Sequence, residues 1–597
     1  MRRTNPGRAP ILGALVAGAA LILTGAGKKK PEIPPKVDET VADVANIVGA
    51  DVKVEGVGLV MGLDNTGSDP APSWQRTKLL DEMRKSGVEH PEKILASPSC
   101  AMVIVRAIVP AGVTMEDKFD VEVELPQASS TTSLAGGWLV STQLAQRALT
   151  REGEKDDKVI AAAVGPIMIG GAAKADDPKV GRILGGGRTK EDSLYVLSIK
   201  EARRSGKTSQ LIENVVKQRF HQVEGVDRKS VATSKTDAYL SLKVPRIYHH
   251  NQDRYHQVIR LLPIVDNPDL RQRRLDQWGK ELLDPKAAGM AALKLEGLGP
   301  GASVVLKQAL GSPDETVRFF AAESLAYLND NDGDVAKVLA ETAKKKPDFR
   351  SFALKAMAAT DQSASMIKLR ALMAEPEFEL RYGAFDALRT LDPTDPFLGK
   401  VRVIDEAPAV ESVDDMALQI EGRARRKPAR KPEEPFALYV VDSEGPPMIH
   451  ISRNMRAEIV VFGKEQKLLT PVVLGAGGPL LLNASDGDKM VQVSKITAKT
   501  LDSGSRVNSP LDIPEVVRRM ANLGSSYPEI VAVLAAASSQ KNLPGPFVVD
   551  AVPLPSKAYD EAQHLADKSK KDDALKKTSG DDGRRGFRQR LKGLMGR

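Results

Sequence analysis

The stretch VEGVGLVMGLDNTGSDP, residues 54–70, contains four glycines: Gly56, Gly58, Gly62 and Gly67. Glycines at this density are typical of nucleotide-binding loops, which have a defined spacing. A dinucleotide loop needs G-x-G-x-x-G between a strand and a helix, whereas this spacing is one residue longer and an apolar run follows Gly58. No G-K-[ST] follows, so the P-loop pattern is absent too. The stretch therefore predicts a structural element, a buried strand with tight turns at Gly56 and at residues 65–67.

Length and charge restrict the class of protein. A chain of 597 residues is expected to form three or four domains. Its net charge of +8 lies at the two ends, because residues 1–27 carry three arginines and residues 553–597 carry a net +5, which leaves the body neutral. A neutral body and only 4% aromatic residues argue against nucleic-acid binding. The single cysteine, Cys100, excludes an intramolecular disulfide and precedes an apolar strand pattern, so we predict a core residue.

The N-terminal residues 1–27 have the pattern of a targeting segment. Arginines at the start precede an apolar run over residues 11–27, and small residues at 24–26 provide a cleavage point near Ala26. We expect a signal peptide and export. The lysines at 28–30 resist translocation, so an uncleaved N-terminal anchor is the alternative. A proline-rich linker is expected over residues 28–41.

Residues 42–268 show mixed strand and helix patterns and predict an α+β domain. Strand patterns occur at residues 58–63, 101–109, 119–125, 138–141 and 159–169, and amphipathic helix patterns occur at residues 76–88 and 208–220. The whole chain is therefore predicted to be a multi-domain α+β protein.

Residues 269–395 contain a helical repeat. Four similar lines begin at residues 287, 317, 349 and 380, about 30 residues apart. The fifth position is always alanine and the ninth is a large apolar residue, while the second is arginine in three lines: Ala291, Ala321, Ala353 and Ala384; Leu295, Leu325, Met357 and Leu388; Arg318, Arg350 and Arg381. These columns predict a short HEAT-type solenoid. Its concave face is expected either to bind an unknown protein or to serve as a rigid spacer, and the module is expected to be separable.

The remaining chain divides by composition. Residues 396–435 form a charged, proline-rich linker. Apolar segments within residues 436–552 predict a small antiparallel β region followed by a helix pair. Residues 553–597 form a charged tail with few apolar residues, which we expect to be disordered.

The opening stretch resembles a known family. GVGLVMGLDNTGSD is similar to the GxGLVxGLxxTGD stretch of the bacterial flagellar P-ring protein family. The resemblance continues through the helix KLLDEMRKSGV and the signature Ser133, Leu134, Gly136 and Gly137, and reaches VIAAAVGPIMIGG. It covers residues 42–172 strongly and extends to about 265, and it is expected to resume in the helix pair within residues 436–552. The helical repeat, the lysine triplet and the basic tail are not part of the family pattern.

The resemblance implies a structural role. It predicts a periplasmic ring of identical subunits, a bushing around the flagellar rod, with rod proteins, outer-ring proteins and peptidoglycan as neighbours. The alternative is an exported envelope adaptor that binds proteins through its solenoid.

Candidates for chemistry are few. The histidines of YHHNQDRYH, His249, His250 and His256, lack the i, i+4 spacing of a helical metal pair, so we predict a polar loop. The run GRILGGGRTKED at 181–192 predicts a glycine-rich turn before a strand, not before the helix that a phosphate site needs. We therefore expect no catalytic residues, no cofactor and no metal.

Overall fold

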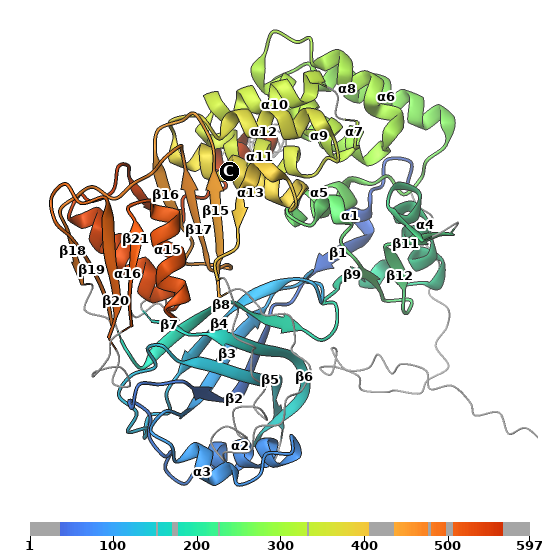
Figure 1. Ribbon diagram of the computed structural model, residues 1–597. Coiled ribbons are helices and arrows are strands. Elements are labelled where there is room, and N and C mark those ends of the chain that lie inside the picture. The colour runs from blue at the N-terminus through green and yellow to red at the C-terminus, as the bar shows by residue number, and fades with distance from the viewer. Residues whose placement is uncertain are drawn as a thin grey trace, which may run out of the picture.

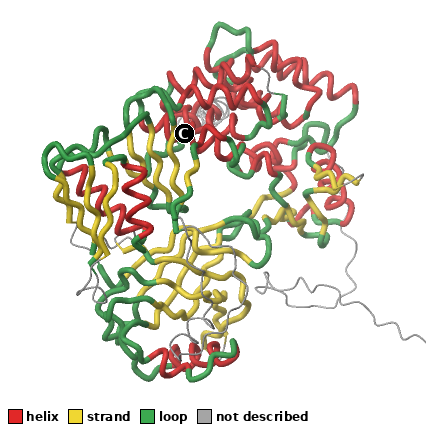
Figure 2. The backbone as a smooth tube through the Cα atoms, in the orientation of Figure 1, coloured by secondary structure: helices red, strands yellow, loops and turns green. Residues whose placement is uncertain are grey.

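A computed structural model describes residues 36–150, 153–169, 177–224, 227–330, 333–404, 435–475, 479–496 and 505–564. The predicted signal peptide, most of both linkers and the tail beyond residue 564 lie outside this part of the chain. The described residues form four parts, a closed sheet, a small sheet, a stack of helices and a pair of C-terminal sheets (Figure 1). Most helices gather in the stack, and strands dominate the other parts (Figure 2).

The closed sheet contains the opening stretch. Its strands are β2 (Val52–Met61), β3 (Ala101–Val109), β4 (Lys118–Glu124), β5 (Trp138–Thr150), β6 (Gly153–Pro166), β7 (Met168–Ile169) and β8 (Val180–Thr189). They lie in the order β4-β3-β2-β5-β6-β8-β7, and pairing of β4 with β8 closes the sheet. Helices α2 (Trp74–Lys85) and α3 (Pro91–Leu95) cover the outer face of β2 (Figure 1). Strand β2 is thus buried on both faces, which explains its continuous apolar run.

The small sheet interrupts the simple order of the chain. Its elements are α1 (Val41–Val44), β1 (Ala45–Val48), β9 (Tyr195–Ile199), α4 (Gly206–Arg219), β12 (Ala232–Ser234) and β13 (Tyr239–Leu242), with the hairpin β10 (His221–Glu224) and β11 (Asp227–Ser230) beside them. Because β1 pairs with β9, the closed sheet is inserted between two neighbouring strands of the small sheet. Two short 3₁₀ turns, Glu201–Arg203 and Arg246–Tyr248, join these elements.

The helical stack contains nine described α-helices: α5 (Gln252–Leu261), α6 (Pro268–Leu282), α7 (Ala288–Leu298), α8 (Ser303–Ala309), α9 (Glu315–Tyr327), α10 (Gly333–Lys345), α11 (Pro347–Ala358), α12 (Ser363–Leu372) and α13 (Phe378–Leu391). Single 3₁₀ turns lie at Pro300–Ala302 and Pro396–Leu398. The predicted HEAT-type stacking is confirmed. One buried apolar cluster extends from the small sheet through the helices to the C-terminal sheet, which removes support for a separable module.

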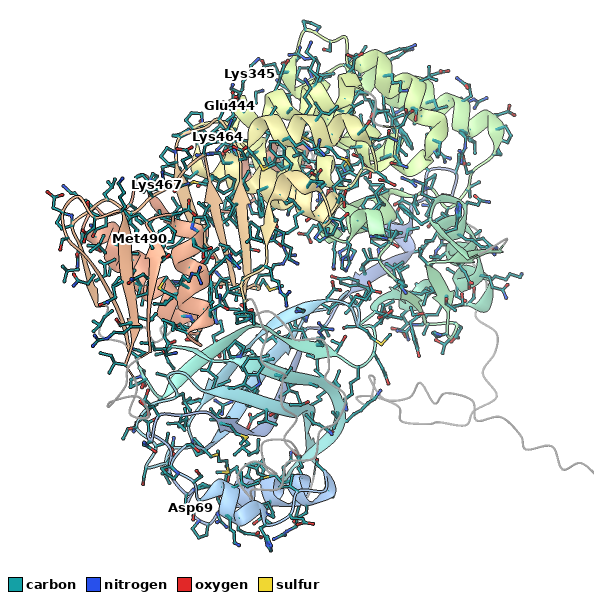
Figure 3. The ribbon with its side chains drawn as sticks, viewed as in Figure 1. Asp69, Lys345, Glu444, Lys464, Lys467 and Met490 are labelled. Atoms are coloured by element: carbon teal, nitrogen blue, oxygen red, sulfur yellow. The ribbon has the colours of Figure 1, made fainter. Side chains whose placement is uncertain are left out.

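The C-terminal part contains two sheets and a helix pair. The five-stranded sheet has β14 (Lys400–Val401), β15 (Ala437–Val441), β16 (Met448–Ile451), β17 (Glu458–Phe462) and β22 (Phe547–Val549); the four-stranded sheet has β18 (Val472–Gly475), β19 (Leu480–Ala484), β20 (Met490–Lys495) and β21 (Ser505–Pro510). Helices α15 (Ile513–Asn522) and α16 (Tyr527–Ser539) form the predicted pair. Lys467 and Met490 lie on the outer surface here (Figure 3).

Three local predictions are wrong. The five-stranded sheet is mixed, because β15 pairs in parallel with β17, and β16 with β22 after a long crossover through α15 and α16. The polar loop predicted around His249, His250 and His256 is helical from residue 252 to residue 261. Asn251 caps this helix, α5, and the apolar side chains of α5 recur on one buried face. The run 181–192 is largely strand β8, which bends at Gly185, where φ is +57°.

The four parts contact one another in a closed circuit. The closed sheet contacts the small sheet where the Gly112 N–H donates to the Ser193 carbonyl at 2.7 Å, and the small sheet contacts the helical stack where Arg219 donates to the Glu296 carbonyl at 2.8 Å. The helical stack contacts the five-stranded sheet where Arg381 donates to the Pro446 carbonyl at 2.5 Å. The C-terminal part returns to the closed sheet where the Met455 N–H donates to Asp120 at 3.0 Å. The circuit is visible in Figure 1.

Candidate functional site

Gly56 and Gly58 lie in the middle of β2, so the predicted turn at Gly56 is wrong. Strand β5 crosses β2 closely here, and the register between them shifts between Glu55 and Val60. A Cβ atom at position 56 would lie 2.3 Å from the Gln143 carbonyl oxygen. A Cβ atom at position 58 would lie 2.6 Å from Thr142 Oγ1. Both positions thus require glycine for close approach of two strands.

Gly62 and Gly67 have different roles at the end of β2. Gly62 adopts a φ of +82°, a conformation that L side chains rarely adopt. The chain then bends at Asp64 and Asn65, close to the predicted turn. Gly67 donates its N–H to the Pro98 carbonyl at 2.8 Å, and a Cβ atom at position 67 would lie 2.1 Å from the Cys100 carbonyl oxygen.

The second motif, Ser133, Leu134, Gly136 and Gly137, packs against the first. Thr66 Oγ1 donates to the Ser133 carbonyl at 2.8 Å, and the Leu134 side chain is fully buried. Gly136 adopts a φ of +73°, while a Cβ atom at position 137 would lie 2.5 Å from Val60 Cγ1. No local sequence pattern signals this contact between the two motifs, since Thr66 and Ser133 are 67 positions apart.

The repeat columns form the interior of the helical stack. The four alanines of the fifth position and the four large residues of the ninth are all fully buried: Ala291, Ala321, Ala353 and Ala384; Leu295, Leu325, Met357 and Leu388. Alanine at one position of each helix lets the neighbouring helix approach.

The repeat arginines close the ends of preceding helices. Arg318 donates to the Ser312 carbonyl at 2.7 Å, Arg350 to the Ala343 carbonyl at 2.9 Å and Arg381 to the Met373 carbonyl at 3.0 Å. Each guanidinium therefore satisfies a carbonyl at or just beyond the C-terminus of a helix.

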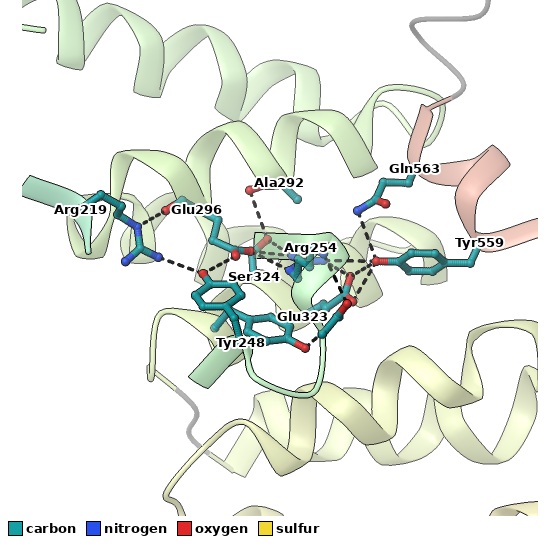
Figure 4. Close-up of polar contacts among 11 residues, drawn as sticks. Arg219, Tyr248, Arg254, Ala292, Glu296, Glu323, Ser324, Tyr559 and Gln563 are labelled. Carbon is teal, nitrogen blue, oxygen red and sulfur yellow. Dashed lines mark hydrogen bonds and ion pairs between the residues drawn. The ribbon is translucent and has the colours of Figure 1, made fainter. Parts of the chain in front are cut away.

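The last described residues of the chain pack against the helical stack. Residues 557–564 form a short helix, the C-terminal helix, so the expected disorder of residues 553–597 is wrong for this stretch. Its Tyr559, labelled in Figure 4, contacts rings of α9 and α11. The Tyr559 ring stacks on the Phe352 ring at 3.4 Å between centroids, and Ser556 donates to Asp348 at 2.7 Å. A Cβ atom at position 289 would lie 2.5 Å from Gln563 Cα, so Gly289 leaves room for this helix. The repeats therefore hold a segment of their own chain.

Tyr559 reaches a buried charged cluster, shown in Figure 4. Arg254 on α5 pairs with Glu296 on α7 at 2.6 Å and with Glu323 on α9 at 2.7 Å. The Tyr559 hydroxyl donates to Glu323 at 2.9 Å, and the Tyr248 hydroxyl donates to Glu296 at 2.7 Å. All five side chains are at most 2% exposed. The Arg254 guanidinium thus links helix α5 to helices α7 and α9.

The cluster has two carboxyl groups for one guanidinium. Burial, which Arg254 and Tyr559 partly offset, raises the pKa of Glu323 to about 7. Burial also raises the pKa of the Tyr559 hydroxyl, and Glu323 adds to that rise. The hydroxyl therefore stays protonated and can serve as the second donor to Glu323.

Comparison with known proteins finds two matched regions in the chain. Residues 40–271 match the family model described as flagellar P-ring protein. Residues 284–389 match the model described as HEAT repeats. Relatives named flagellar P-ring protein include those of Aquifex aeolicus (28% identical, covering 35% of this chain and 57% of the relative), Thermotoga maritima (33%, covering 23% and 38%) and Bdellovibrio bacteriovorus (32%, covering 27% and 45%). The chain thus spans about half the length of these relatives, or less.

The P-ring-like segment, residues 40–271, includes the closed sheet, the small sheet and α5. The match ends just inside α6, before the repeats. The expected resumption within residues 436–552 lies outside the matched range and stays a prediction. Arg254 belongs to this segment, whereas Glu296 and Glu323 belong to the HEAT-like repeats. The charged cluster is therefore the junction between the two matched regions.

The predicted histidine cluster serves a second junction of the P-ring-like segment. His249 Nε2 lies 3.1 Å from Asp117 of the closed sheet. Burial alone would raise the pKa of Asp117, but hydrogen bonds from His249 and Thr114 outweigh it and lower this pKa to about 2. The bond to Asp117 in turn raises the pKa of His249. Among the described residues, no group of three His, Cys, Asp or Glu side chains could hold a metal ion.

The contact between the P-ring-like segment and the C-terminal sheet centres on Asp120. Its carboxylate accepts the Gly185 N–H at 2.8 Å and the Met455 N–H at 3.0 Å. Arg182 donates to Asn454 at 3.0 Å beside it. A cavity of about 800 Å³ opens here, and its six charged side chains are balanced between the two signs. This balance gives the cavity no preference for an anion or a cation.

A further polar group fastens α13 to the C-terminal sheet. Arg389 pairs with Glu458, and the Tyr527 hydroxyl donates to the Glu458 carbonyl at 2.9 Å. The Tyr382 ring stacks on His450 at 3.5 Å, and burial lowers the pKa of His450 to about 3. His450 is thus a neutral packing residue.

In the part of the chain that the structure describes, no helix is both long and apolar enough to cross a membrane.

Proposed function

We propose that this protein is a structural component of the bacterial flagellar basal body that assembles with copies of itself into a P-ring-like bushing around the rod. The observation that carries the proposal is the match of residues 40–271 to the flagellar P-ring protein model, together with relatives of that name. The role is mechanical, so subunit burial and not turnover is its chemistry.

The glycine motifs support a structural role. The positions that resemble the family, Gly56, Gly58, Gly67 and Gly137, admit close packing within the closed sheet, against backbone atoms at Gly56 and Gly67 and against side chains at Gly58 and Gly137. A neutral body suits the packing of identical subunits, because like-charge repulsion would accumulate around a ring.

The HEAT-like repeats and the C-terminal sheets are proposed as additions to the ring subunit. They lie beyond the P-ring match and join it through Arg254 and Asp120. The protein partners proposed are other copies, rod proteins and outer-ring proteins, with peptidoglycan as a neighbour in the periplasm. Export with cleavage near Ala26 belongs to the same proposal. The adaptor alternative gains no support from the relatives, and the repeats already hold the chain's own C-terminal helix.

The test is a deletion of the gene, followed by purification of flagellar basal bodies and electron microscopy. We expect the deletion strain to lose the periplasmic ring and motility, and a tagged copy to restore both and co-purify with basal bodies. A matched pair of complementing copies sharpens the test: Gly56→Ala should restore the ring poorly, whereas Gly206→Ala, whose new Cβ atom meets nothing within 4 Å, should restore it fully. Intact rings in the deletion strain, with the tagged chain absent from basal bodies, would refute the proposal.

A further inference from the structure

Positive charge is concentrated in two short stretches of the sequence. Residues 584–597, RRGFRQRLKGLMGR, carry six Arg and Lys side chains and no Asp or Glu, whereas residues 565–583 before them carry five of each sign. We call residues 584–597 the basic segment. The lysine triplet, residues 28–30, is the second stretch, and the proposed cleavage near Ala26 leaves it on the chain. Both stretches lie outside the part that matches the P-ring model, and the proposed ring gives neither a role.

Apolar side chains alternate with the cations of the basic segment. Four of them recur at the i, i+4, i+7 and i+8 positions that share one face of a helix: Phe587, Leu591, Leu594 and Met595. A soluble polyanion would neutralise the cations and leave the apolar side chains in water. The boundary between lipid headgroups and acyl chains accepts both kinds of side chain. The composition and spacing of the basic segment therefore favour the surface of an anionic bilayer.

The C-terminal helix fixes the place from which the basic segment extends. Tyr559 and Gln563, both labelled in Figure 4, are each only 2% exposed. Gln257 Nε2 of α5 lies 3.5 Å from His564 Nε2, so the described chain is in contact with α5 up to its last residue. Residues 565–583, at about 3.3 Å each, allow the basic segment to lie at most roughly 63 Å from this contact.

The lysine triplet is joined to the same helix. Thr40 pairs with Pro263 directly after α5, and the Val41 N–H donates to the Leu262 carbonyl at 3.0 Å. Residues 31–39 separate the triplet from this pairing, which gives it a reach of roughly 30 Å. Both basic stretches therefore extend from neighbours of one helix, and their reach lets them contact one surface together.

We propose that the basic segment and the lysine triplet bind the surface of an anionic lipid bilayer and hold the protein to it through α5. The cations are attracted to the anionic headgroups, and the apolar side chains of the basic segment enter the boundary below them. Once one stretch has bound, the other is held at a high effective concentration near the surface, so the two together bind more tightly than either alone. The inference goes beyond the proposed ring and does not depend on it.

The test is co-sedimentation of the chain, without its leader, with lipid vesicles. One set of vesicles contains three parts of phosphatidylcholine to one part of phosphatidylglycerol, and the other contains phosphatidylcholine alone. We expect a partition coefficient about tenfold higher on the anionic vesicles at low salt, falling as salt screens the charges. Equal partition to both sets, or binding to neither, would overturn the proposal.

Two variants with the same change of charge locate the binding. The first replaces three cations of the basic segment, Arg585→Gln/Arg588→Gln/Lys592→Gln, and should lower the partition coefficient on anionic vesicles about tenfold. The control replaces three exposed lysines of the body, all labelled in Figure 3: Lys345→Gln/Lys464→Gln/Lys467→Gln. The control should bind as wild type does. An equal loss in both variants would show that overall charge and not the basic segment is responsible, which contradicts the proposal.

The variant Leu591→Ser/Leu594→Ser distinguishes a bilayer from a soluble polyanion, because it keeps all six cations. It should lose about tenfold in partition to anionic vesicles and bind polyphosphate as wild type does. Undiminished partition of this variant would overturn the choice of a bilayer. Replacement of the whole lysine triplet by glutamine should lower partition about threefold, and wild-type binding by that variant would refute the joint site.

Discussion

Replacement of Gly56 by alanine tests whether the glycines of β2 serve strand packing. The new Cβ atom would lie 2.3 Å from the Gln143 carbonyl oxygen, a backbone atom that cannot rotate away, so β5 must shift. Overpacking of this kind costs about 1–3 kcal/mol, and a backbone clash belongs at the upper end. Gly58→Ala meets side-chain atoms of Thr142 and Leu139, at 2.6 and 2.8 Å, so the cost should be lower.

The assay is hydrogen exchange resolved to peptides of β2 and β5, because a protein of several parts does not unfold in one step. We expect faster exchange in the order Gly56→Ala, Gly58→Ala, wild type. Thr142→Ala should partly rescue Gly58→Ala, because it removes the clashing Oγ1 atom, and should not rescue Gly56→Ala. Gly206→Ala is the control, since it lies at the start of α4 with open space around it. Unchanged protection of β2 and β5 in Gly56→Ala would refute the packing role.

Other predictions follow from buried polar groups. Burial raises the pKa of Glu323 from 4.5 to about 7 in the folded protein, so the folded state holds the proton more tightly than the unfolded state. The free energy that this adds to folding stability is fully present below pH 4.5 and is lost as the pH rises through 7. The protection of α9 in wild type relative to Glu323→Gln should therefore fall by about 3 kcal/mol between pH 4.5 and 8, measured by hydrogen exchange of α9 peptides corrected for the intrinsic rate, and a flat difference would contradict this. Arg381→Leu should cost about 2–4 kcal/mol, because the side chain is fully buried and bonds to two parts, whereas Arg318→Leu, at a side chain 27% exposed, should cost about 1 kcal/mol. Asp120→Ala should speed exchange of the Met455 amide without affecting the repeats, and equal protection in both proteins would rule out the Asp120 junction.

Periodicity predicted the local elements, because each depends on neighbours in sequence. The strand at residues 101–109 has the predicted bounds, and Ala291 lies in a helix interior because its repeat column required it. The helix after Asn251 was missed because its polar letters YHHNQDR concealed a cap and a buried face. Strand β8 was missed because three glycines signal a turn, whereas here one permits a bend and another admits the Phe119 ring. The charged cluster was beyond reach, since Arg254 and Tyr559 are 305 residues apart and no local pattern joins them.

The closed circuit of four parts has a mechanical consequence. In a chain of domains joined end to end, a force must pass through every junction, so the weakest one sets the stiffness. Here torque applied to the closed sheet can pass to the helical stack along two routes, through the small sheet and through the C-terminal sheets. Springs in parallel add their stiffness, and a broken junction leaves its two faces held close by the intact route, ready to rebind. A stationary bearing subjected to the drag of a turning shaft would thereby tolerate transient rupture at one junction and recover its shape between revolutions.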